Sequence, residues 1–216
     1  MKLYYFPKAP HARKVLIFLV EKGLSLELIQ VDLEKKENLK EAFLAKNSRG
    51  VVPVLELDDG TCIDESLAIC RYLEALNPEP PLFGSTPLEK ALVDSWDRHM
   101  EFDGYLPGQD AFRNSAERFA NYAVAGVQEP VKAIPALAER GMQRIDIFFK
   151  RLDERLAEVP YVAGTQFSMA DITGVVAVDM TKRVNKFLPE SLEHAQRWYR
   201  AMYERKSVSS TYVAHK

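Results

Sequence analysis

The N-terminal third of the chain alternates between short strand-like and longer helix-like patterns of hydrophobic positions. Residues 2–6 are short and aromatic, which favours a strand. Residues 10–22 place apolar side chains at helical spacing ahead of Gly23, a residue that commonly ends a helix. The same periodicities predict further strands at 25–33, 51–57 and 61–64, and helices at 38–46 and 65–76.

Beyond a segment rich in proline, the pattern becomes purely helical. Pro135 and Gly141 interrupt it, so residues 129–141 are expected to be irregular or kinked. The expected helices are 88 to about 113, 115–128, 142–159, 170 to about 185, and 190–206. The sequence therefore predicts an α/β domain at 1–78 with the element order βαβ-α-ββα, a linker at 79–87, and an all-helical domain at 88–216.

Composition narrows the class of protein. Of the 216 residues, 47% are hydrophobic and 28% charged, and the net charge is −2, which suits a soluble protein without a nucleic-acid partner. The longest apolar run is too short for a membrane span, and no signal-peptide pattern follows it. Cys62 and Cys70 alone make no disulfide framework, so we expect a cytoplasmic protein. The four histidines lack metal-ligand spacing, so no metal is expected.

Three local motifs carry most of the remaining information. Val52-Pro53 leads into a predicted strand, where a proline belongs at the start or the edge. Glu65-Ser66 opens a predicted helix, a place that favours anions but also ordinary capping residues. Ser168 and Asp171 have the spacing of a capping box, with Phe167 and Ile172 as its hydrophobic staple.

Together with the layout, these motifs resemble the cytosolic glutathione S-transferase family, in its bacterial type. The resemblance implies a thioredoxin-like N-terminal domain and a helical C-terminal domain that holds the substrate and the dimer interface. It implies that glutathione is the co-substrate, that its thiolate is conjugated to a small electrophile, and that the protein is a homodimer. The Val52-Pro53 bond is then expected to be cis.

Glutathione-binding residues follow from the same resemblance. Val52, next to Pro53, would pair through its backbone with the cysteinyl unit of glutathione. Glu65 would accept the glutamyl ammonium, and Ser66 would bind the glutamyl carboxylate. Asn38 and Lys40 match positions that hold the glycyl carboxylate, and Lys46 or Arg49 could substitute.

The group that activates the thiol is the least determined feature. A cysteine thiol has a pKa near 8.5, so a donor to its sulfur is needed at neutral pH. Ala9 occupies the position where related proteins carry Ser, Cys or Thr, and alanine donates nothing. The remaining candidates are His11, which we rank first, and Tyr5. Backbone N–H groups near Pro10 would assist.

Two other functions fit the same pattern. A glutathione-dependent disulfide or peroxide reductase without its own cysteine is compatible with Ala9. A non-enzymatic interaction protein could retain the fold alone, but Glu65 and Ser66 would then have no explanation.

Overall fold

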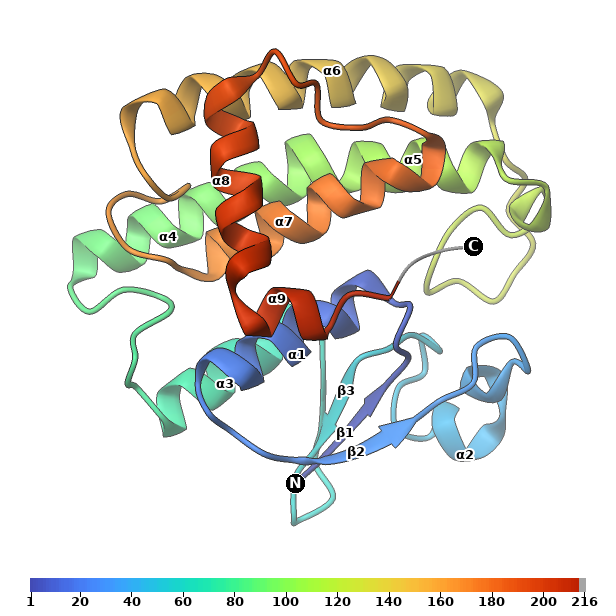
Figure 1. The fold of residues 1–216 in the computed structure, drawn as a ribbon. Coiled ribbons are helices and arrows are strands. Elements are labelled where there is room, and N and C mark those ends of the chain that lie inside the picture. The colour runs from blue at the N-terminus through green and yellow to red at the C-terminus, as the bar shows by residue number, and fades with distance from the viewer. Residues whose placement is uncertain (214–216) are drawn as a thin grey trace.

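A four-stranded mixed sheet forms the base of the N-terminal part of the molecule (Figure 1). The computed structural model describes residues 1–213. The strand order is β2-β1-β3-β4; β1 runs parallel to β2 and antiparallel to β3, and β3 is antiparallel to β4. The strands are β1 (Lys2–Tyr5), β2 (Glu27–Gln30), β3 (Val54–Glu56) and β4 (Cys62–Asp64).

Alternation along the strands assigns each face of the sheet to a different set of helices. Leu3 and Leu55 are fully buried and pair across β1 and β3, in the same core as the helices α1 (Pro10–Glu21) and α3 (Ser66–Leu76). Val54 belongs to a smaller core with Phe43 of α2 (Glu41–Leu44), which follows the 3₁₀ turn η1 (Glu37–Leu39). This period of two is what a sheet covered on both sides requires.

The C-terminal part is entirely helical. A long helical stretch comprises α4 (Pro87–His99), the π-helical segment η2 (Met100–Tyr105) and α5 (Leu106–Ser115). All residues of α7 are buried, so α7 is the central helix of this part. The other elements are η3 (Glu117–Phe119), α6 (Pro135–Glu158), α7 (Met169–Thr181), η4 (Lys182–Val184), α8 (Glu193–Glu204) and α9 (Lys206–Ser210).

One predicted helix is wrong. After α5 ends at Ser115, residues 116–128 contain only the short turn η3, and residues 120–134 form a loop that we call the strap. The apolar side chains of Tyr122, Val124 and Val127 are exposed, so they do not form the buried face that a helix here would need. Gly126 has a positive φ of 76°, which a helix does not allow. The prediction that residues 129–141 are irregular also fails in part. They are helical from Pro135 onward, because proline is well accommodated in the first turn of a helix.

The two parts are joined by buried charges as well as by apolar contacts. Arg13 of α1 forms an ion pair of 2.5 Å with Asp179 of α7, and both side chains are almost fully buried. Arg13 also donates to the carbonyl of Val208 at 3.1 Å, and Tyr203 donates to Asp179 at 2.7 Å. These contacts hold α1 against the helical part. No helix within residues 1–213 is long and apolar enough to cross a membrane.

Candidate functional site

The peptide bond between Val52 and Pro53 is cis, as expected. Val52 is 8% exposed and packs in the smaller core. Its backbone N–H and C=O form no hydrogen bond with any of residues 1–213. Because buried backbone groups are nearly always paired, an extended ligand that supplied one donor and one acceptor would complete this position.

The start of α3 is shaped by an unusual backbone conformation. Glu65 has φ 63° and ψ 119°, which is strained for a residue other than glycine. The first N–H groups of α3 point out of the helix here, and Ser66 is almost fully buried beside them. The Glu65 carboxylate forms an ion pair with Arg49, and Asp64 lies 4.0 Å from the same guanidinium.

The structure brings His11 and Ser66 together, although 55 residues separate them. Nδ1 of His11 lies 3.4 Å from Oγ of Ser66, and the His11 ring packs edge-on against Tyr105 at 4.5 Å. Burial, and then the positive charge of Lys14, lower the pKa of His11 to about 3. The imidazole is therefore neutral at physiological pH. It can donate one N–H but cannot supply a positive charge.

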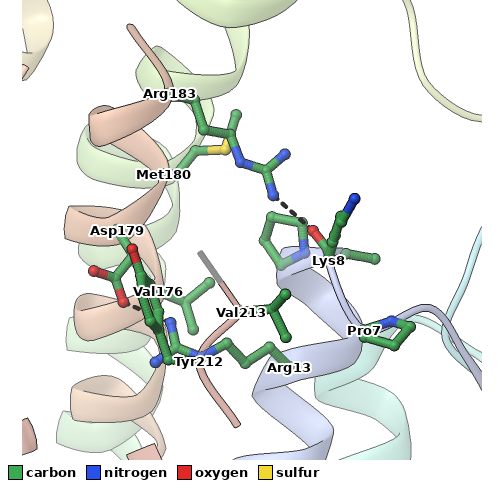
Figure 2. A pocket seen from close by; sticks show the side chains of 11 residues that line it. Pro7, Lys8, Arg13, Val176, Asp179, Met180, Arg183, Tyr212 and Val213 are labelled. Atoms are coloured by element: carbon green, nitrogen blue, oxygen red, sulfur yellow. Dashed lines mark hydrogen bonds and ion pairs between the residues drawn. The ribbon is translucent and has the colours of Figure 1, made fainter. Parts of the chain in front are cut away.

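The other residues near the start of α1 offer fewer groups that could contact a thiolate. Ala9 is the N-cap of α1 and makes no side-chain cap, as alanine must. Tyr5 is half-buried and packs against the main core. Its hydroxyl has no hydrogen-bond partner among the described residues. Beside Ala9 the structure has a hollow between α1 and α7, lined also by Val176 and Met180 (Figure 2).

The residues predicted to contact a glycyl carboxylate differ in their surroundings. Asn38 donates from Nδ2 to the carbonyl of Gly50 at 2.7 Å, which steadies that loop. Lys40 is exposed at the N-cap of α2. Lys46 is paired with Glu56 at 2.5 Å. Of these groups, Lys40 is the one whose charge remains available to a ligand.

Neither cysteine is placed for thiol chemistry. Burial raises the pKa of the Cys70 thiol strongly, and it raises that of Cys62 as well. A raised pKa keeps the thiol protonated and unreactive. Within residues 1–213 no three His, Cys, Asp or Glu side chains gather as a metal site would require.

Sequence reasoning missed the contribution of the strap. Gln128 donates to the carbonyl of Ser48 at 2.9 Å, and Gly126 packs against the guanidinium of Arg49. Arg49 in turn binds Glu65. The strap thus reaches from the helical part to the start of α3, a contact across 80 residues that no local pattern signals.

Two family models match the chain. The glutathione S-transferase N-terminal domain matches residues 3–81, and the glutathione S-transferase C-terminal domain matches residues 119–206. Together these matches cover most of the chain.

Individual relatives agree with the family models. The chain is 37% identical to glutathione S-transferase 2 of Saccharomyces cerevisiae over 213 residues, which is 96% of this chain and 88% of the relative. The crystal structure of Gtt2 from Saccharomyces cerevisiae superposes with a TM-score of 0.88 at 34% identity, over 98% of this chain and 100% of that one. The structure of a class Gtt2 glutathione S-transferase of Vibrio parahaemolyticus superposes with a TM-score of 0.83 at 35% identity. The match covers 98% of this chain and 96% of that one.

Proposed function

This chain belongs to the glutathione S-transferase family and is a glutathione transferase, and we propose that Val52, Glu65 and Ser66 hold its glutathione while His11 orients the thiolate. The observation that supports this assignment best is the meeting of two helix starts at the Ser66–His11 contact. The starts of α1 and α3 then face one ligand, and both favour negative charge.

The glutamyl end of glutathione carries an ammonium and a carboxylate, so the protein binds it with an acceptor and donors that lie side by side. The Glu65 carboxylate accepts hydrogen bonds from the ammonium, and the Ser66 hydroxyl and the free N–H groups of α3 donate to the carboxylate. Arg49 already lies against Glu65, so it also places a positive charge near the glutamyl carboxylate. The strained backbone of Glu65 is maintained because it turns this side chain toward the ligand.

The cysteinyl unit lies along the unpaired backbone of Val52. Pro53 ends the ladder at this position, so the ligand pairs with Val52 as a short antiparallel strand would. The glycyl carboxylate then falls on the side of Asn38 and Lys40, where the charge of Lys40 attracts it.

Thiolate formation combines a helix start with one side-chain donor. The start of α1 stabilises an anion by at most about 2 kcal/mol. Lowering a thiol pKa by two to three units requires about 3–4 kcal/mol. Because Nδ1 of His11 faces Ser66, a neutral His11 supplies part of the difference through an N–H at Nε2, and the hydroxyl of Tyr5 is the second donor.

The alternatives of a disulfide or peroxide reductase and of an interaction protein gain no support from the site. For the assembly, we expect a cytoplasmic homodimer. Leu88 and Leu92 are one helical turn apart on α4, and both are exposed, which suits a partner surface.

The glutamyl site provides the direct test. Glu65→Gln and Ser66→Ala should each weaken glutathione binding by about 1–3 kcal/mol, because each leaves a charged group of the ligand without its partner. Isothermal titration calorimetry measures this, with Glu117→Gln in the helical part as the control. Unchanged affinity in both site variants would overturn the assignment.

A further inference from the structure

Three arginines gather around two phenyl rings in the helical part. Phe112 and Phe119 pack edge to face at 5.4 Å. Arg113 lies over Phe119 at 4.2 Å, and Arg118 contacts both rings at 4.9–5.0 Å. Arg183 lies over Phe112 at 5.4 Å. We call these five side chains the arginine–aromatic cluster.

Two arginines of the cluster, Arg113 and Arg118, lack the acidic partners that other cations of this protein have. Arg13 pairs with Asp179 and Lys14 with Glu101. In contrast, neither Arg113 nor Arg118 forms an ion pair with a carboxylate among residues 1–213.

Arg113 donates instead to backbone carbonyls of the strap, Ala123 at 2.6 Å and Tyr122 at 2.7 Å. Carbonyls satisfy its donors but leave its charge uncompensated. Burial, together with the charge of Arg118, lowers the pKa of both Arg113 and Arg183. Arg113 and Arg118 therefore create a positive potential that an anion would relieve.

The cluster borders the reacting centre. Arg183 donates to the carbonyl of Lys8 at 2.6 Å, immediately before Ala9 and the start of α1 (Figure 2). Arg183 lines the hollow between α1 and α7, and it also lines a second hollow with Phe112 and Met142. The two hollows thus share Arg183, which connects the surface beside Phe112 to the start of α1.

We propose that this transferase prefers planar electrophiles that carry an anionic group, with the ring against Phe112 and the anion on Arg118 and Arg113. The proposal rests on the proposed function, since it requires the thiolate at the start of α1. The fork of Arg118 can donate two parallel hydrogen bonds to a carboxylate, and Arg113 adds its charge, whereas a neutral electrophile offers the arginines no counter-charge.

A matched pair of electrophiles tests the preference. 4-Chloro-3,5-dinitrobenzoate carries a carboxylate, and 4-chloro-3,5-dinitrobenzamide has nearly the same shape without charge. In both, the glutathione sulfur forms a bond to the ring carbon that bears chlorine, and chloride leaves with the electron pair of the broken bond. Each kcat/KM is divided by the uncatalysed rate constant with glutathione, which removes the difference in intrinsic reactivity.

The expected ratio of benzoate to benzamide is about tenfold or more, as a charge-assisted hydrogen bond provides. Arg118→Gln should lower this ratio about fivefold, and Arg118→Lys should restore part of it. Raising the salt concentration should also lower the ratio, because Arg118 is exposed. Arg200→Gln, an exposed arginine on α8, is the control and should leave the ratio as in the wild type.

The outcomes separate this proposal from the one on which it depends. Equal acceleration of both electrophiles, or a ratio that does not respond to Arg118→Gln, overturns the anion preference while the transferase site stands. If neither electrophile is conjugated and calorimetry detects no glutathione binding, both proposals fall.

Discussion

His11 illustrates how the surroundings of one residue determine its chemistry. In the sequence it is a histidine in the first turn of a helix, which can be either charged or neutral near pH 7. In the fold it lies between Ser66 and Tyr105, and its pKa is about 3. It can therefore act on a thiolate only as a neutral donor.

This role predicts the effect of removing the donor. His11→Ala should raise the pKa of bound glutathione by about one unit, equivalent to about 1.4 kcal/mol. Tyr5→Phe should raise it less, because the ring still packs and only the hydroxyl is lost. Thiolate absorbance against pH in the binary complex measures both shifts. A larger shift in Tyr5→Phe would show that Tyr5 is the main donor.

The same burial predicts a dependence of stability on pH. Unfolded His11 has its ordinary pKa near 6.5, so below that pH the unfolded state binds a proton that the native state does not. Stability is then lost as the pH falls. Between pH 7 and pH 5 the loss from His11 should be about 1–2 kcal/mol. Urea unfolding at both pH values measures it. His11→Asn should lose correspondingly less, and equal losses would contradict the shifted pKa.

At the scale of elements, the start of α7 can be predicted from the local sequence, whereas the loop conformation of the strap cannot. The capping box at Ser168 and Asp171 can be identified from spacing alone, and it is present: the Asp171 carboxylate accepts from the Ser168 N–H at 3.0 Å. The strap has apolar residues at helical intervals but no core to face. Local spacing identifies a cap, whereas only packing decides whether an apolar face is used.

The strap should also affect glutathione binding at a distance. In Gly126→Ala the new Cβ would lie 3.2 Å from the Arg49 guanidinium, at a positive φ. We expect the affinity for glutathione to fall by about 1 kcal/mol, because Arg49 is displaced from Glu65. Calorimetry measures the affinity and thermal unfolding measures the stability.

Gly164→Ala is the matched control for this variant. Gly164 also has a positive φ, but its Cβ would meet nothing within 4 Å. It should lose stability without losing glutathione affinity. If Gly126→Ala behaves in the same way, the strap has no part in the glutamyl site.

At the scale of the whole molecule, the two parts depend on a buried ion pair. Arg13 and Asp179 come from different parts of the chain, 166 residues apart. Arg13→Met should destabilise the protein by about 3–5 kcal/mol, because it leaves a buried carboxylate without its main cation. Urea unfolding measures this. Arg71→Gln, which breaks the exposed pair with Asp94, is the control and should cost under about 1 kcal/mol. Similar losses in both variants would contradict a structural role for the buried pair.

The sequence by itself determined most of the elements and the motifs whose physics is local. Strand and helix periods, the proline before β3, and the capping box of α7 each depend on residues within a few positions of one another. Such features are encoded in spacing, so the mixed fold could be predicted from it, and Val52, Glu65 and Ser66 could be proposed as site residues together with the family resemblance.

Only the tertiary structure decided which of these residues meet and in what charge state. The contact of His11 with Ser66 and the reach of Gln128 to Ser48 join residues 55 and 80 positions apart. The neutral state of His11 follows from desolvation by groups that fold around it. Burial and long-range electrostatics are properties of the packed chain, and no short stretch of sequence contains them.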